Sequence, residues 1–263
     1  MFSPRRARAG SIVAVSGNAS KLTERKLIKG STTRAPGVVI RLAGADDVAA
    51  VERMAPVAGT TLGEVLAEAI RSGAMGSAHR AALAAGGGDR GREAFTHAIA
   101  RAAAEHDQFH AYAVAAVVLV AAHRDHGVVG AEIVFPPVHV AENYVTYARN
   151  AGANSREQGK LLAVGAVGLA KVSALVVDES HRGRGLGAAL LGQARRIFFA
   201  HGYPLVYGQI PADRPDLAGF YQCQGFEVRR PEDRLDLETV FGIPGGIRPD
   251  RGERFFVCWN PHL

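Results

Sequence analysis

The sequence predicts an α/β fold built around a mixed central sheet. Three observations lead to this prediction: an opening strand followed by helices, two apolar runs joined by a four-residue turn, and a strand–glycine turn–helix unit after them. A short turn joins antiparallel strands, whereas a strand–helix–strand crossover joins parallel ones. Both kinds of connection are present, so both kinds of pairing are expected in one sheet.

The first third of the chain alternates strand and helix signals. Asp46 offers an N-cap for a helix whose apolar residues Val48, Val51 and Met54 recur at helical spacing. The glycines at 86–88 break a longer amphipathic pattern. The expected elements are a strand at 38–42 and helices at 48–54, 61–85 and 92–105.

The middle of the chain predicts a hairpin. Residues 111–123 and 127–135 are apolar runs, and the turn "RDHG" between them suits two antiparallel strands. Residues 136–160 are expected to form a long connection with one short helix near 141–149. The apolar stretch 161–177 is interrupted by glycines, so one long bent strand or two strands are both possible.

The last third predicts alternating strands and helices again. A helical pattern follows the glycine-rich turn, with Leu190, Leu191, Ala194, Ile197 and Phe198 on one face. The remaining expected elements are strands at 204–210, 225–228 and 254–259 and a short helix at 216–224.

Charge divides the chain into a tail and a body. Residues 1–35 contain eight lysines and arginines against one glutamate, whereas the remainder is close to neutral within the net charge of +6. We therefore expect a disordered basic tail over 1–35 and one domain over 36–263. A near-neutral body argues against a nucleic-acid-binding fold.

Without a long apolar run, a cytoplasmic protein that does not enter membranes is expected. Cys223 and Cys258 are expected to be buried free thiols.

The stretch "SALVVDESHRGRGLGAALLGQARRIF" (Ser173–Phe198) predicts a phosphate-binding turn. Backbone N–H groups of a glycine-rich turn at a helix N-terminus form a surface that favours negative charge. A P-loop is excluded because no Gly-Lys-Ser/Thr follows. A dinucleotide-binding fingerprint lacks its acidic residue in the next strand, "PLVYGQI".

A third pattern fits. Arg182-x-x-Gly185-x-Gly187 resembles the R/Q-x-x-G-x-G/A signature of the GNAT superfamily of N-acetyltransferases. "GFYQCQGFEV" (Gly219–Val228) resembles that family's closing motif, and residues 38–54 resemble its opening strand and helix. The similarity covers roughly Val38–Val228. Pro215 departs from the asparagine common in relatives, and the segments near 60–110, 136–160 and 229–254 are longer than usual.

The resemblance implies a mostly antiparallel sheet, splayed where acetyl-CoA binds. The glycine turn would hold the pyrophosphate, the preceding strand would pair with pantetheine and polarise the thioester carbonyl, and one or both arginines would add charge. The implied cofactor-binding residues are Leu175, Val176, Val177, Arg182, Gly183, Arg184, Gly185, Leu186, Gly187 and Ala188.

Tyr221 occupies the place of the family's general acid, which would protonate the departing CoA thiolate; the alternative is a packing role. Candidates for the general base are Glu132 first, then Asp178 and Glu142. An exposed alternating strand position is the other explanation for Glu132.

His106 and His110 are expected on the surface and His181 in a solvent-facing turn, so no metal site is expected.

The function implied is direct transfer of an acetyl group from acetyl-CoA to a primary amine of a small molecule or peptide. Alternatives are a longer acyl group or a non-catalytic CoA-binding regulatory module. The sequence does not identify the acceptor, and a homodimer is possible.

Overall fold

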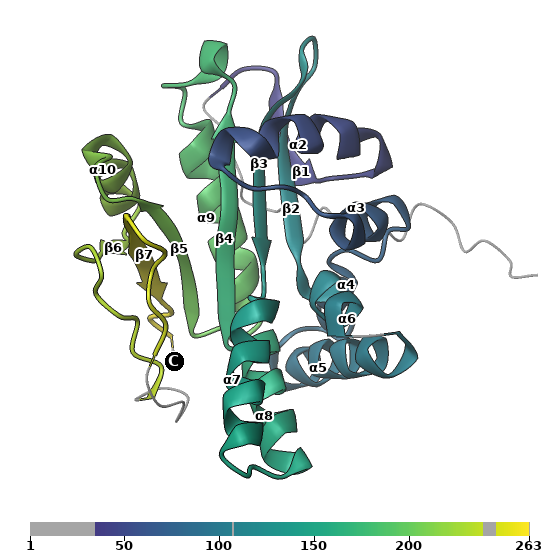
Figure 1. Ribbon diagram of the computed structural model, residues 1–263. Helices are drawn as coiled ribbons and strands as arrows, with labels where there is room; N and C mark the ends of the chain where they lie inside the picture. Colours follow the sequence, from purple (N-terminus) through teal and green to yellow (C-terminus); the bar gives the residue numbers. More distant parts are fainter. Residues whose placement is uncertain (1–34, 107, 239–245, 263) are drawn as a thin grey trace, which may run out of the picture.

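The computed structural model describes residues 35–106, 108–238 and 246–262, and these form a seven-stranded sheet with helices against both faces (Figure 1). The strand order is β1-β2-β3-β4-β5-β7-β6. Only β4 and β5 pair in parallel within the described residues, so the sheet is mixed and mostly antiparallel, as predicted. The strands are β1 (Val38–Leu42), β2 (Val117–His123), β3 (Gly127–Phe135), β4 (Leu169–Val177), β5 (Leu205–Pro211), β6 (Glu227–Val228) and β7 (Glu253–Trp259).

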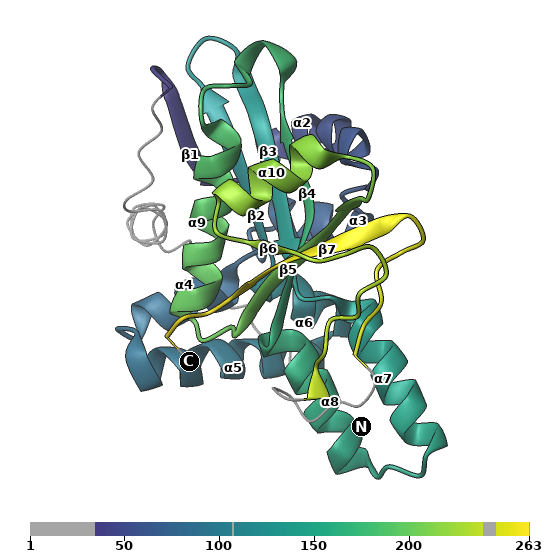
Figure 2. The same ribbon diagram turned by 90° about the vertical axis from the view of Figure 1, so that its left-hand side faces the viewer.

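Helices cover the sheet unequally. The long helix α9 lies along one face, and α2 and α3 lie against the other, while α7 and α8 extend beyond one end of the strands (Figures 1 and 2). The helices are α2 (Val48–Met54), α3 (Glu64–Arg71), α4 (Ser77–Ala84), α5 (Gly88–Glu105), α6 (Gln108–Ala115), α7 (Val138–Asn150), α8 (Ser155–Val167), α9 (Leu186–Ala200) and α10 (Pro215–Cys223), with 3-10 turns η1 (Ala45–Asp47), η2 (Ala55–Ala58) and η3 (Glu179–His181). No helix among the described residues combines the length and apolarity that crossing a membrane requires.

The central hairpin forms the middle of the core. Residues 117–121 of β2 are all essentially inaccessible to solvent. Their run of valine, leucine and alanine shows no polar alternation because helices cover both faces of the sheet. The predicted hairpin is confirmed in β2 and β3, but residues 111–115 belong to α6 instead of the strand. That helix is apolar on every side because α3, α4, α5, α7 and α8 surround it, so no helical periodicity is visible.

The segment 136–167 contains two helices where one short helix was expected. α7 and α8 pack against each other, and Gly165 of α8 is buried at their contact. A Cβ at Gly165 would overlap the Cβ of Ala141, so the glycine permits the close approach of the helices. The sequence prediction took this glycine as a break within a strand, and for residues 161–167 that prediction is wrong.

Two boundaries in the first third also differ from the prediction. Residues 61–85 form two helices, α3 and α4, because Gly73 and Gly76 adopt positive φ between them. The capping carboxylate in this region belongs to Asp47 and not Asp46, and it caps the 3-10 turn η1 that precedes α2. Its Oδ2 accepts a 2.8 Å hydrogen bond from the Gly44 N–H, and its Oδ1 accepts one of 2.8 Å from Arg41.

The parallel strands β4 and β5 separate partway along their length. They pair only from Leu169 with Leu205 to Val172 with Gly208. Beyond this point, within the described residues, β4 continues to Val177 with β3 as its strand partner, and β5 continues to Pro211 with β7. We call this opening between the two strands the wedge. Gly208 lies at its apex, where any Cβ would overlap the ring of Phe256.

Candidate active site

A glycine turn closes one side of the wedge. Gly183 and Gly185 have φ values of 72° and 78°, a left-handed conformation that side-chain-bearing residues rarely adopt. Gly185 is the residue before α9, so the turn leads directly into a helix N-terminus. No atom lies within 4 Å of a Cβ placed at either glycine, which leaves the turn open to a ligand. Backbone N–H groups at such a turn attract an anion.

A pocket of about 460 Å³ lies between the end of β4, this turn and α10. Leu175 and Val177 face it from β4, whereas Val176 is buried on the opposite side of the strand. Most of the residues predicted to bind the cofactor line it. These are Leu175, Val177, Arg182, Gly183, Gly185, Leu186, Gly187 and Ala188.

The two arginines of the turn differ in their contacts. Arg182 lines the pocket, and its Nε donates a 3.0 Å hydrogen bond to the carbonyl oxygen of Val177, the last residue of β4. Arg184 is exposed and does not line the pocket. Its charge does contribute to the lowered pKa of nearby His181, so it adds to the positive potential around the turn.

Tyr221 lines the same pocket from α10. Its side chain is almost buried, and its ring stacks on Phe256 with centroids 3.6 Å apart and planes inclined by 13°. Burial raises the pKa of the Tyr221 hydroxyl, and the nearby carboxyl of Glu132 raises it further. The hydroxyl is therefore protonated at neutral pH and can act only as a proton donor there.

Glu132 lies beneath the pocket in the middle of β3. It pairs across the sheet with Leu175, so the two side chains share a face, and it is completely buried. Its two carboxyl oxygens have no hydrogen-bond partner among the described residues, and burial raises its pKa well above the ordinary value. Burial therefore favours the uncharged form of this carboxyl. The alternative of an exposed strand position is wrong, because α9 covers this face of β3.

The other candidate bases lie outside the pocket. Asp178 follows β4 directly, and its backbone N–H donates to the carbonyl of Val129. Glu142 belongs to α7, where its charge raises the pKa of Tyr112. Neither side chain lines the pocket.

Four further residues line the pocket: His181, Leu217, Phe220 and Gln224. The last three share a helix face with Tyr221 at i, i+3, i+4 and i+7 spacing, a pattern visible in the sequence. His181 was expected to face solvent, and that expectation is wrong. It is only 6% exposed because His123 and His126 of the β2–β3 turn pack against it.

The remaining sequence predictions have mixed outcomes. The rings of His106 and His110 lie 5.0 Å apart where α5 ends and α6 begins, and His106 is exposed. Cys223 is exposed at the end of α10 and Cys258 is half-buried, so the expectation of buried thiols is wrong. The expected tail over residues 1–34 lies outside the described residues and stays a prediction.

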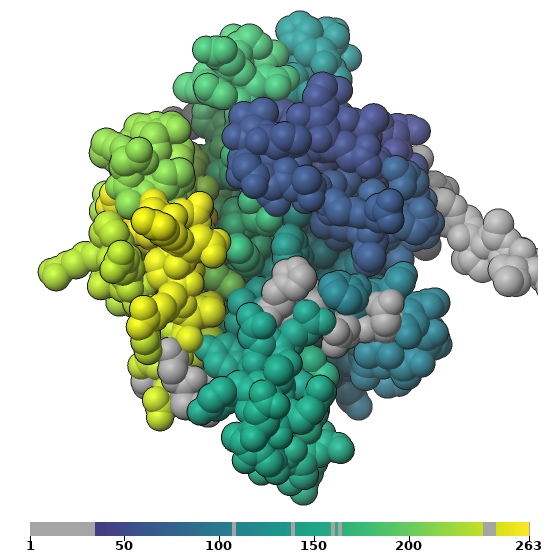
Figure 3. Space-filling model, in the orientation of Figure 1, coloured from purple at the N-terminus to yellow at the C-terminus, as the bar shows by residue number. Residues whose placement is uncertain are grey.

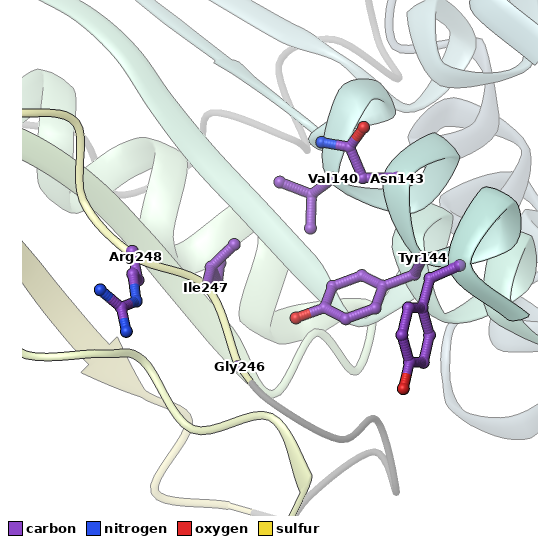
Figure 4. Close-up of a pocket in the computed structure, with 7 residues that line it drawn as sticks. Val140, Asn143, Tyr144, Gly246, Ile247 and Arg248 are labelled. Atoms are coloured by element: carbon purple, nitrogen blue, oxygen red, sulfur yellow. The ribbon is translucent and has the colours of Figure 1, made fainter.

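A second pocket of about 400 Å³ lies between α7 and the C-terminal segment (Figure 4). Tyr144 points from α7 towards Ile247 and Arg248 across it. It shares no lining residue with the pocket of Tyr221. Tyr221 and most of the residues predicted to bind the cofactor therefore line the pocket at the wedge, and none of them lines this second pocket.

Comparisons with known proteins agree with this site. Residues 116–228 match the family model described as an acetyltransferase (GNAT) domain. That match runs from β2 to β6 and contains the glycine turn, Glu132 and Tyr221. No curated protein sequence gives a significant match.

Several solved structures resemble the chain. NAA60 of Arabidopsis thaliana, solved with a bisubstrate analogue, is 14% identical, with 84% of this chain and 97% of that chain covered and a TM-score of 0.44. A GNAT-family acetyltransferase of Streptococcus pneumoniae is 14% identical, with 84% and 98% covered and a TM-score of 0.41. An acetyltransferase of Streptococcus agalactiae is 17% identical, with 55% and 66% covered and a TM-score of 0.36, so the chain spans about two thirds of that protein. On the family match, residues 116–228 resemble a GNAT acetyltransferase domain.

Proposed function

We propose that this protein transfers the acetyl group of acetyl-CoA directly to a primary amine of a small molecule or peptide. The observation that carries the proposal is the shared pocket: the open glycine turn, the unpaired side of β4 and the Tyr221 side chain all meet there. The family match over the same residues supports it.

The cofactor is expected to be held mainly by backbone groups. The pyrophosphate would accept hydrogen bonds from the amides of Gly183–Ala188 at the start of α9. The pantetheine arm contains amides, and the wedge side of β4 beyond Val172 has no strand partner among the described residues. Pairing with Leu175–Val177 would direct the thioester towards Tyr221, and a β4 N–H would stabilise the developing oxyanion.

The acceptor is expected to enter from the opposite side of the wedge. Figure 3 shows a hollow between the helices that follow β1 and the surface formed by α10, β6 and β7, with β4 at its floor. The amine nitrogen attacks the thioester carbon, the C–N bond forms and the C–S bond breaks. The thiolate then takes the Tyr221 proton, which leaves the acetylated amine and CoA.

The sequence predicts Glu132 as the general base, but burial raises the pKa of its carboxyl well above the ordinary value, which favours the protonated form. We propose that Glu132 instead stands behind Tyr221 and returns a proton to it once the thiolate has been protonated. The two groups are near enough for Glu132 to influence the pKa of the Tyr221 hydroxyl. The amine would lose its proton to water in the hollow.

Binding of acetyl-CoA is tested by two substitutions at one position. Gly185→Glu and Gly185→Gln impose the same backbone strain and nearly the same bulk, but only the glutamate places a negative charge where the pyrophosphate is expected. We expect calorimetry with acetyl-CoA to show at least tenfold weaker binding for Gly185→Glu than for Gly185→Gln. Equal affinities in two folded variants would contradict the proposed anion site.

A further inference from the structure

Three histidines from two distant parts of the sequence meet beside the glycine turn. His123 ends β2, His126 lies in the turn between β2 and β3, and His181 ends η3, directly before Arg182. Each offers a ligand atom, and these atoms all lie within 4.8 Å of one another. The cluster forms because the β2–β3 turn and the loop after β4 lie at the same end of the sheet (Figure 1).

The rings are oriented by contacts around them. The His126 Nδ1 lies 3.1 Å from the His181 Nε2, and the Ser180 Oγ lies 2.9 Å from the His181 Nδ1. The rings of His123 and His126 stack with centroids 4.3 Å apart and planes inclined by 13°. Outer hydrogen bonds of this kind fix the ring orientation of metal-binding histidines.

His181 is buried against the rings of His123 and His126. His126 is exposed and His123 is half-buried, so an ion can reach the cluster from solvent.

We propose that His123, His126 and His181 bind one divalent transition-metal ion, with Zn²⁺ as the best match. Three imidazole ligands and one open position for water are a set that Zn²⁺ accepts at Zn–N distances of about 2.0–2.1 Å. Tetrahedral geometry at these distances brings ligand nitrogens to about 3.3 Å apart. The observed separations meet this after small side-chain rotations, and Mg²⁺ and Ca²⁺ are disfavoured because they prefer oxygen ligands.

Metal binding would connect the β2–β3 turn with the loop that follows β4. The ion would tie the β2–β3 turn to the residue immediately before Arg182. It would also add positive charge beside the turn expected to hold the pyrophosphate. The metal site itself does not depend on the proposed acetyl transfer, because all three ligands are supplied by the chain.

Titration of the full-length, tag-free protein with ZnCl₂ in the absence of any CoA compound tests this site. We expect one high-affinity Zn²⁺ per chain, intense visible absorption when Co²⁺ replaces it, and a melting temperature that rises with zinc concentration. His126→Ala should lower zinc affinity at least 100-fold, because loss of an outer hydrogen bond alone costs 10–100-fold. Since His126 is exposed, this variant is expected to fold normally.

The control is the double variant His106→Gln/His110→Gln, which removes a neighbouring histidine pair elsewhere in the chain. It should leave the tight site intact. Absence of tight zinc binding, or binding that survives His126→Ala and disappears in the control, would overturn the proposal. His181→Asn provides a second ligand variant, and retention of the Co²⁺ spectrum in that variant would overturn it as well.

Discussion

The ring of Tyr221 has a packing role, and we propose a chemical role for its hydroxyl group. Its ring stacks on Phe256 at the apex of the wedge, while its hydroxyl is kept protonated by burial and by Glu132. Tyr221→Phe keeps the stack and removes only the proton donor. We expect kcat to fall about 10²–10⁴-fold with acetyl-CoA affinity nearly unchanged, because the donor acts as charge develops on sulfur.

The measurement is release of the CoA thiol with an amine acceptor found by screening. Tyr147→Phe is the matched control, since Tyr147 is 64% exposed on α7 and lies outside the pocket of Tyr221. Full kcat in Tyr221→Phe would show that the tyrosine only packs.

Glu132 should make stability depend on pH in an unusual direction. Burial raises its folded-state pKa above the ordinary 4.5, so the folded state holds this proton more tightly than the unfolded state. Its contribution to the free energy of unfolding is therefore largest below pH 4.5 and is lost as pH rises through the raised pKa. Glu132→Gln removes this loss. We expect the variant to be more stable than the wild type at pH 8, by about 1.4 kcal/mol for each unit of pKa difference.

Urea unfolding at pH 8 and pH 5 measures the effect, and the advantage of Glu132→Gln should shrink at the lower pH. Glu64→Gln on the exposed side of α3 is the control for the substitution itself. An equal difference at both pH values would mean that Glu132 is charged in the folded protein.

The helices inserted before the hairpin dock onto α9 through a buried histidine. His79 of α4 is fully buried, its Nε2 donates a 2.8 Å hydrogen bond to the carbonyl of Ala115, and its Nδ1 lies 3.2 Å from the Nδ1 of His201 at the end of α9. Phe95 and Phe198 pack against its ring. This contact ties α4 and α5 to the core of the acetyltransferase domain.

Protonation should weaken this contact. Burial and His201 lower the pKa of His79 from 6.5 to about 3, so between these values the unfolded state binds a proton that the folded state does not. Stability from this group is present above pH 6.5 and falls by about 1.4 kcal/mol per pH unit below it. His79→Gln keeps a donor for Ala115 and cannot titrate. Its unfolding free energy, measured in urea between pH 7.5 and 5, should fall less steeply than that of the wild type, and identical slopes would count against the assignment.

Local patterns predicted some elements and missed others. The hairpin of β2 and β3, the glycine turn and α10 follow from turn chemistry and spacing within a few residues. α6 was missed because helices packed among other helices lose the polar face that marks them. α8 was missed because Gly165, which allows its close packing on α7, was taken as a break within a strand. Glu132 pairs with Leu175 and lies near Tyr221 because of the register between β3 and β4. Local sequence patterns do not determine that register. The histidine cluster likewise needs residues 55 positions apart to meet.

Across the whole molecule, the sheet order and its mostly antiparallel pairing agree with the family resemblance, and the additional length forms helices at the ends and faces of that sheet (Figure 2). Of the segments expected to be longer than usual, the one near 60–110 contains α3, α4 and α5, and the one near 136–160 contains α7 and the start of α8, so these two are folded elements and not loose loops.

The wedge also sets how freely this sequence can change over evolutionary time. Its walls offer main-chain N–H and C=O groups, and nearly every amino acid presents these groups in the same way. Only a few positions are constrained by shape: Gly183 and Gly185 by their backbone angles, and Gly208 by the ring of Phe256. Most neighbouring residues can therefore be substituted without losing the main-chain hydrogen-bonding groups of the strand edge. The side where we propose that the acceptor enters is formed by side chains, so substitutions there would change recognition while the proposed cofactor side stays the same.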